Sequence, residues 1–66
     1  MNIQSAVKNA YDRIECNGVE FTSGDVVQVL INGEWLLTRI EHNGREYYSI
    51  DGYQLIGNPV KYPNQD

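Results

Sequence analysis

The sequence predicts a mainly β fold, in which a small antiparallel meander curls into an SH3-like barrel and a short N-terminal helix precedes it. Asn-Gly or Asp-Gly pairs occur four times, beginning at residues 17, 32, 43 and 51. Such pairs are the strongest short-range hairpin signal, because a type I′ turn needs positive φ at both central positions. The segments between the pairs are rich in β-branched and aromatic residues, which favour strands. The pattern therefore predicts strands joined by two-residue turns.

All 66 residues are expected to form one domain, with a helix over 2–11, a meander over 12–62 and a flexible tail over 63–66. Within the meander, residues 60–62 are expected to form a last short strand. A chain of this length buries only about 60% of the surface that its unfolded form exposes, so its core is small. Enzyme clefts usually need about 300 Å³ or more, which favours a binding protein over an enzyme.

The helix is predicted from apolar residues at i, i+3, i+4 and i+7, which mark one helix face. These residues are Ile3, Ala6, Val7 and Ala10. Asn2 is expected to cap the helix, which must dock on the sheet because so short a helix is marginal alone. We expect it to end near Tyr11, with a hairpin following that turns at Asn17-Gly18. The alternative is a helical stripe that continues through Ile14 toward the glycine.

Two-residue turns fix the register of the strands that they join. The cross-strand pairs expected around the four turns are Ile14–Phe21, Leu30–Trp35, Ile40–Tyr47 and Tyr48–Leu55. One sheet face then carries Val27, Val29, Ile31, Leu36, Ile40, Tyr47 and Ile56. The other carries Leu30, Trp35, Leu37, Tyr48, Ile50, Tyr53 and Leu55, with Val26 and Arg39. Because a solvated antiparallel sheet has one polar face, two apolar faces predict barrel closure over one and a helix or partner over the other.

Composition narrows the classes of partner. Nine acidic residues against five basic ones give a net charge of −4, and the basic residues form no run. A protein that grips phosphates normally carries the opposite sign, which argues against nucleic acid. Cys16 is the only cysteine, so an internal disulfide is excluded and a buried apolar role is expected. With neither signal-peptide regions nor a run of roughly 20 apolar residues, we expect a cytoplasmic protein without membrane contact.

The segment SGDVVQVLINGEWLLTRIEHNGREYYSI, residues 23–50, resembles a family of small domains of unknown function from Gram-positive bacteria and their mobile elements. The shared core is a Gly-Asp turn, a Leu-Ile-Asn-Gly-x-Trp hairpin and a Thr-Arg-Ile-Glu strand. The matching residues are Gly24, Asp25, Val29, Leu30, Ile31, Gly33, Trp35, Thr38, Arg39, Ile40, Glu41 and Tyr48. Ser23 stands where the family usually has Cys. The resemblance implies an all-β domain of a bacterium or phage, and it implies no activity and no site residues.

The aromatic residues are the best candidates for a binding surface. The predicted register places Trp35, Tyr48 and Tyr53 on one face beside Arg39. Tyr, Trp and Arg are enriched at binding hot spots, and aromatic rings can also stack on bases. The alternative is that these rings only pack the core and form cross-strand pairs.

No residue pattern indicates a catalytic or metal site, and no cofactor is expected. His42, the only histidine, precedes a turn and is interpreted as a solvated turn residue. No His or Cys spacing matches a metal site. Glu41 and Glu46 are expected to face each other across a hairpin as an exposed pair.

The sequence favours a non-enzymatic protein-binding module, acting as a regulator or inhibitor of a host protein and encoded by a phage or mobile element. Self-association is a second use of an uncovered apolar face. One alternative is capture of a nucleotide-like ligand by an oligomer, with Arg39 and the aromatics in the pocket. Another is single-stranded nucleic-acid binding by stacking, for which the basic groove is missing.

Overall fold

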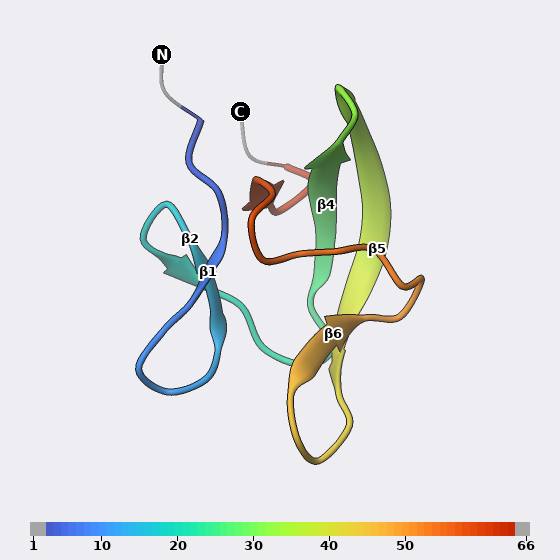
Figure 1. Cartoon of the computed structure of the whole chain (residues 1–66). Helices are drawn as coiled ribbons and strands as arrows, with labels where there is room; N and C mark the ends of the chain where they lie inside the picture. The colour runs from blue at the N-terminus through green and yellow to red at the C-terminus, as the bar shows by residue number, and fades with distance from the viewer. Residues whose placement is uncertain (1–2, 65–66) are drawn as a thin grey trace.

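A computed structural model describes residues 3–64 and contains two antiparallel sheets (Figure 1). The strands are β1 (Val7–Lys8), β2 (Ile14–Cys16), β3 (Val19–Glu20), β4 (Val26–Ile31), β5 (Glu34–His42), β6 (Tyr47–Ser49) and β7 (Val60–Lys61). The smaller sheet has the order β1-β2-β3, and the larger sheet has the order β6-β5-β4-β7. The prediction of a mainly β fold is therefore confirmed.

Two of the four predicted hairpins form with the expected register. Asn17-Gly18 and Asn32-Gly33 have positive φ at both positions, as a type I′ turn requires. In the second hairpin, Leu30 lies opposite Trp35. In the first, the Phe21 N–H donates to the Ile14 carbonyl at 2.8 Å, which confirms that predicted pair.

The predicted helix over 2–11 is wrong for the part that the structure describes, because residues 3–64 contain no helix. β1 pairs with β2, and the Ala6 N–H donates to the Asn58 carbonyl at 2.9 Å. The Asn9 side chain accepts hydrogen bonds from the Tyr11 and Arg13 N–H groups, which stabilises a turn in place of a helix. Ala6 is buried but Val7 is exposed, so the expected apolar stripe does not form. Asn2 lies outside the described residues.

At Asn43-Gly44 the chain reverses through a four-residue loop rather than a two-residue turn, because Tyr47 pairs with His42 and not with Ile40. The Asn43 side chain accepts hydrogen bonds from the N–H groups of Arg45 and Glu46, which stabilises this wider loop. The predicted register is therefore wrong by two residues. A shift of two preserves the side of the sheet to which each side chain points, so the face of the tyrosine is still as expected.

The predicted hairpin at Asp51-Gly52 does not form in the described chain, and residues 53–56 make no strand against β6. The Gly52 N–H donates to the Ser49 carbonyl, and the Thr38 hydroxyl donates to the Asp51 carboxylate at 2.7 Å. These bonds hold the turn against β5 and send the following segment across the molecule. The last predicted strand is confirmed as β7, which pairs with β4.

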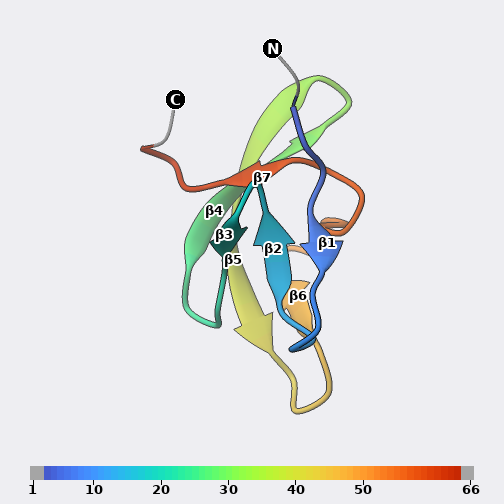
Figure 2. The same cartoon turned by 90° about the vertical axis from the view of Figure 1, so that its left-hand side faces the viewer.

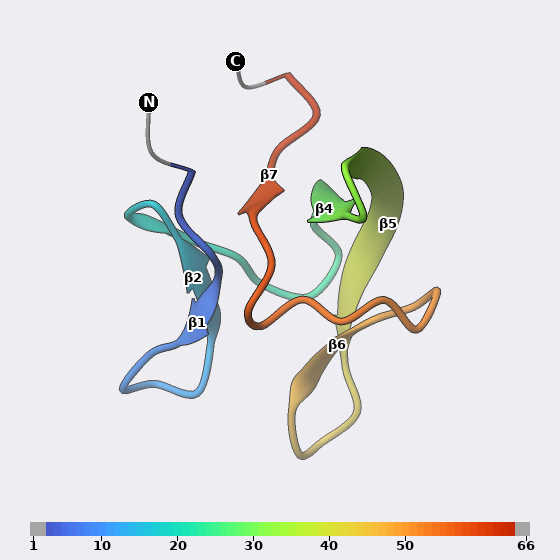
Figure 3. The ribbon, with the colours of Figure 1, turned by 45° about the horizontal axis from the view of Figure 1, so that its top comes forward.

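The sheets do not close into a barrel within residues 3–64, so the SH3-like barrel is a second correction. In the larger sheet β6 and β7 remain edge strands, and β7 runs between the two sheets (Figures 2 and 3). The short β1–β3 sheet lies beside the larger sheet and covers its inner face, so a second layer replaces barrel closure. The core residues are Ala6, Ile14, Cys16, Phe21, Val27, Val29, Ile40, Leu55 and Val60.

Cys16 joins three segments of this core, which agrees with its expected buried role. Its thiol donates to the Gln4 carbonyl at 3.2 Å and accepts from the Val60 N–H at 3.5 Å. A second contact joins the C-terminal segment to the loop before β4. There Tyr62 packs edge-on against Phe21 and donates to Asp25 at 2.9 Å. Burial and the nearby carboxylate raise the pKa of Tyr62.

Candidate functional site

The larger sheet has one buried face and one exposed face. Side chains alternate along each strand, so Val27 is fully buried while its neighbour Val26 is 46% exposed. We call the exposed side the outer face. Its residues are Val26, Gln28, Leu30, Trp35, Leu37, Arg39, Glu41, Tyr48, Ile50 and Lys61. Leu37, near its centre, is 60% exposed, so the face presents apolar side chains directly to solvent.

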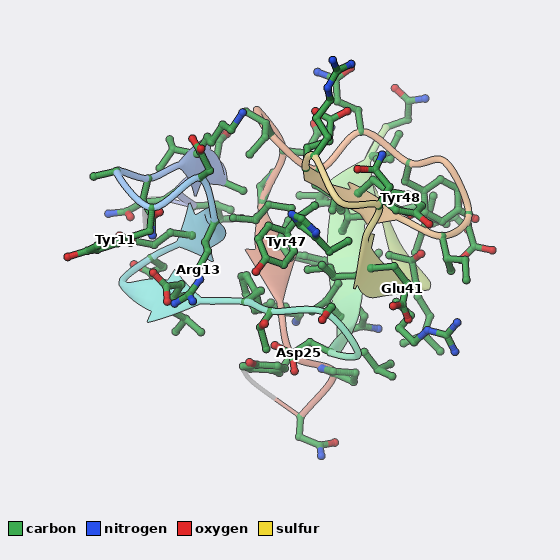
Figure 4. The ribbon with its side chains drawn as sticks, turned by 90° about the horizontal axis from the view of Figure 1, so that it is seen from below. Tyr11, Arg13, Asp25, Glu41, Tyr47 and Tyr48 are labelled. Carbon is green, nitrogen blue, oxygen red and sulfur yellow. The ribbon has the colours of Figure 1, made fainter. Side chains whose placement is uncertain are left out.

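Three of the four predicted site residues, Trp35, Arg39 and Tyr48, lie on the outer face, as expected. They are spread along it, because Trp35 is at the start of β5 and Tyr48 lies opposite Glu41 near the end of that strand. Tyr48 and Glu41 point to the same side of the larger sheet (Figure 4). Tyr53 is the exception. It packs against the core and not beside these residues, because the hairpin that was expected to place it does not form. For the same reason Leu55 is buried in the core and Ile56 is exposed, the reverse of their predicted faces.

Charged groups on the outer face contact its aromatic rings or one another. The Arg39 guanidinium forms an ion pair with the Glu41 carboxylate, and Glu41 lies opposite Tyr48 across the strands. The Lys61 ammonium lies 4.4 Å from the centre of the Trp35 ring, a cation–π contact. An exposed ion pair adds little stability, so its effect is to orient the guanidinium beside the apolar residues.

A hollow of about 490 Å³ lies beside β6, next to the outer face. Its lining residues are Ile14, Glu46, Tyr47, Tyr48, Ser49, Gly52, Tyr53, Gln54, Leu55 and Ile56. The hollow exists because residues 53–56 do not pair with β6. Sequence reasoning missed it for that reason, since Asp51-Gly52 indicated a hairpin that would have filled this space. Tyr48 belongs to both surfaces and stands at their shared edge.

A polar cluster bridges the two sheets near this hollow. The Arg13 guanidinium lies 2.9 Å from the Glu20 carboxylate, and the Asn9 amide donates to the same carboxylate at 2.7 Å. Hydrogen bonds from Arg13 and Asn9 lower the pKa of Glu20. A hydrogen bond to Glu20 and, as the next largest cause, a hydrogen bond to Tyr47 raise the pKa of Arg13. Arg13 and Tyr47 face each other from the two sheets (Figure 4), so this cluster lies where the smaller sheet approaches β6.

The residues considered for catalysis have local structural contacts. His42 packs edge-on against Tyr47, and its Nδ1 accepts a hydrogen bond from the Gly44 N–H, as a turn residue does. The predicted pairing of Glu41 with Glu46 is wrong, since Glu41 lies opposite Tyr48. Over residues 3–64, no group of three or more His, Cys, Asp or Glu residues could hold a metal ion. In the same range no helix is long and apolar enough to cross a membrane.

The fold and the site define a small β domain of two sheets whose exposed apolar and aromatic residues lie on an open sheet face. The chain belongs to the family described as Domain of unknown function (DUF5348), whose model matches residues 5–62. The match includes both sheets and all of the described site. The expected membership of a family of small domains of unknown function is thereby confirmed. No curated protein and no solved structure is significantly similar to the chain.

Proposed function

We propose that the protein is a non-enzymatic protein-binding module whose partner docks on the outer face. One observation carries this proposal: the outer face presents to solvent three aliphatic side chains, each at least 46% exposed, from Val26, Leu37 and Ile50. Large exposed apolar patches are uncommon on soluble monomers and mark sites of interaction. The protein would then act by occupying a surface of its partner, as a regulator or inhibitor encoded by a phage or mobile element would do.

The chemistry of the outer face supports a protein partner. Trp, Tyr and Arg are the residue types that contribute most at interfaces, especially where apolar neighbours exclude water. Here Trp35 lies in the same row as Leu30 and next to Leu37, while Arg39 and its ion-pair partner Glu41 lie toward Tyr48. With Lys61 over Trp35 at the β7 side, this arrangement gives apolar residues flanked by charged groups, which resembles the general anatomy of interfaces.

Capture of a nucleotide-like ligand is a second candidate, and the hollow beside β6 favours it. Its volume of about 490 Å³ lies within the range of small-molecule sites, about 300–1,000 Å³. Arg39 does not line the hollow, however, and it is engaged by Glu41. The cation expected to bind a phosphate is therefore not at the cavity, and the protein-binding proposal has the stronger support.

A pair of surface variants tests the proposal. Leu37→Lys places a charge in the centre of the outer face. Tyr11→Lys is the control, because it places the same charge at an exposed turn of the smaller sheet, where Tyr11 is 77% exposed. Both variants should keep the unfolding free energy of the wild type to within about 0.5 kcal/mol, because surface changes rarely cost more. Each is used as bait in an extract of the source organism, and captured proteins are quantified by mass spectrometry.

The wild type and Tyr11→Lys should capture the same proteins in similar amounts. The captured amount should be at least about tenfold lower with Leu37→Lys, since a charge in an apolar interface centre costs over about 1.4 kcal/mol of binding free energy. Equal capture by all three baits would contradict binding through the outer face. Retention of a small molecule by the wild type, with no protein captured, would favour the second candidate.

A further inference from the structure

The free edge of β6 carries backbone groups that point away from β5. In an antiparallel sheet, each residue directs its N–H and its carbonyl to the same side of its strand. Successive residues alternate between the two sides. The Ile50 N–H donates to the Arg39 carbonyl at 2.9 Å, and Ile40 bonds instead toward Gly24 and Asp25 on the far side of β5. Tyr47 and Ser49, which lie opposite His42 and Ile40, therefore direct their backbone groups outward.

One of these outward groups is already bonded, which supports the assignment of direction. The Ser49 carbonyl accepts the Gly52 N–H at 2.9 Å. The N–H and carbonyl of Tyr47 and the N–H of Ser49 face the open side of β6 in the described part of the chain. A single extended residue of another chain could bond both groups of Tyr47, as a hydrogen-bonded antiparallel pair does.

The hollow lies along this same edge and gives an added strand room for its side chains. Tyr47 and Ser49 line it together with Ile14 and Ile56 from other segments. An added strand would lie about 4.8 Å from β6 and would point alternate side chains to opposite faces. One set would enter the hollow against Ile14 and Ile56, and the other set would extend the outer face beyond Tyr48.

We propose that the free edge of β6 binds an extended peptide segment of the partner as an added strand of the larger sheet. This inference rests on the proposed function, because it states how a protein partner would reach the outer face. Strand addition is a recurrent mode of peptide recognition in which main-chain hydrogen bonds provide affinity and pockets provide specificity. The backbone edge requires a peptide in extended form, and the neighbouring hollow requires an apolar side chain at alternate positions.

Charge at one end of the hollow indicates a basic residue in the peptide. Glu46 lines the hollow and also a smaller adjoining cavity of about 50 Å³. Asp12 and Lys8 also line that smaller cavity, so its lining contains two acidic residues and one basic residue. The whole chain has a net charge of −4. A peptide with a Lys or Arg next to its apolar residue complements this arrangement.

The test uses peptides selected from a displayed library of short random sequences against the full chain. A selected peptide is then synthesised in two forms, unmodified and with alternate backbone amides N-methylated. Amide hydrogen exchange is followed by NMR with and without saturating peptide. The Tyr47 and Ser49 amides should exchange at least about tenfold more slowly when the peptide is bound, because new hydrogen bonds protect them. The Tyr48 amide, which points to β5, should change little.

Two further results are expected if the strand adds to β6. N-methylation on the edge-facing side should weaken binding at least about tenfold, because a lost hydrogen bond leaves a buried backbone group unpaired. Glu46→Lys should weaken binding of the basic peptide several-fold. Glu34→Lys, an exposed carboxylate beside the Asn32-Gly33 turn, should leave binding unchanged and serves as the matched control.

Two outcomes would overturn strand addition. In the first, selected peptides perturb Trp35 and Leu37 without protecting Tyr47 and Ser49, so that the protein-binding proposal stands and this mode of binding fails. In the second, no peptide is selected at all. Capture by wild type and Leu37→Lys would then still decide the proposed function separately, because it does not depend on a strand-like partner.

Discussion

The two faces of the larger sheet have similar apolar character and opposite exposure. Val27 and Val26 are adjacent on β4 and identical in type, yet the first is 0% and the second 46% exposed. The inner face is covered by the smaller sheet and by the segment that follows β6, whereas residues 3–64 provide no such cover for the outer face. The rest of the chain, and not the hydropathy of the strand, therefore decides which face becomes core.

The valine pair on β4 gives the largest expected difference between the faces. Val27→Ala should lower the unfolding free energy by about 2–3 kcal/mol, because it removes two buried methyl groups and leaves a cavity. Val26→Ala should cost less than about 1 kcal/mol, mostly through strand propensity. Urea unfolding monitored by Trp35 fluorescence measures both variants. Equal costs would mean that the outer face is covered in solution.

A buried polar contact on the inner face gives a second comparison between a buried and an exposed position. Thr38 and Ser49 are buried, and their hydroxyl oxygens lie 2.7 Å apart, with Asp51 accepting from Thr38 at 2.7 Å. Thr38→Val removes the central hydroxyl and should cost about 1–3 kcal/mol, since the two remaining polar groups lose a partner. Thr22→Val, at an exposed loop position, is the control and should stay within about 0.5 kcal/mol. A neutral result for Thr38→Val in urea unfolding would argue against this network.

The smallest expected effect lies in the exposed cluster that joins the two sheets. Hydrogen bonds from Arg13 and Asn9 lower the folded-state pKa of Glu20 below its unfolded value. The stabilisation is therefore present above the unfolded pKa and is lost as pH falls through the lowered folded pKa. The urea midpoint of Glu20→Gln should fall less between neutral pH and about pH 3 than that of the wild type.

Glu34→Gln serves as the control for this pH dependence, because Glu34 is exposed and lies outside the cluster. It should retain the acid sensitivity of the wild type. If Glu20→Gln and Glu34→Gln behave alike, the contact with Arg13 does not contribute to the acid dependence.

The hairpins show how far local signals predict this fold. Asn32-Gly33 has positive φ at both positions, and its register follows from the sequence. At Asn43-Gly44 only the glycine has positive φ, because the Asn43 side chain bonds the backbone of the loop instead. The register is shifted by two residues from the predicted one, and a shift by an even number leaves Tyr47 and Tyr48 on their predicted faces. Local turn signals therefore predicted the side of the sheet to which each β6 residue points, but not the β5 residue with which it pairs.

The missed features depend on contacts between distant segments. Apolar spacing in residues 3–10 fits a helix, but Ala6 bonds to Gly57 and Asn58, which no local pattern reveals. Asp51 bonds to Thr38 instead of closing a hairpin, and this contact creates the hollow beside β6. The outer-face positions of Trp35, Arg39 and Tyr48 follow from strand alternation and were predictable, whereas the packing of Tyr53 against the core was not.

The central claim is that the outer face is not part of the folded core. Its most direct test is the unfolding free energy of the combined variant Leu37→Lys, Tyr48→Thr and Ile50→Thr, measured in urea at two protein concentrations. We predict a value within about 1 kcal/mol of the wild type, independent of concentration. A loss of more than about 3 kcal/mol, which is most of the stability of a domain this small, would show that the face is buried in the folded protein and would contradict the claim.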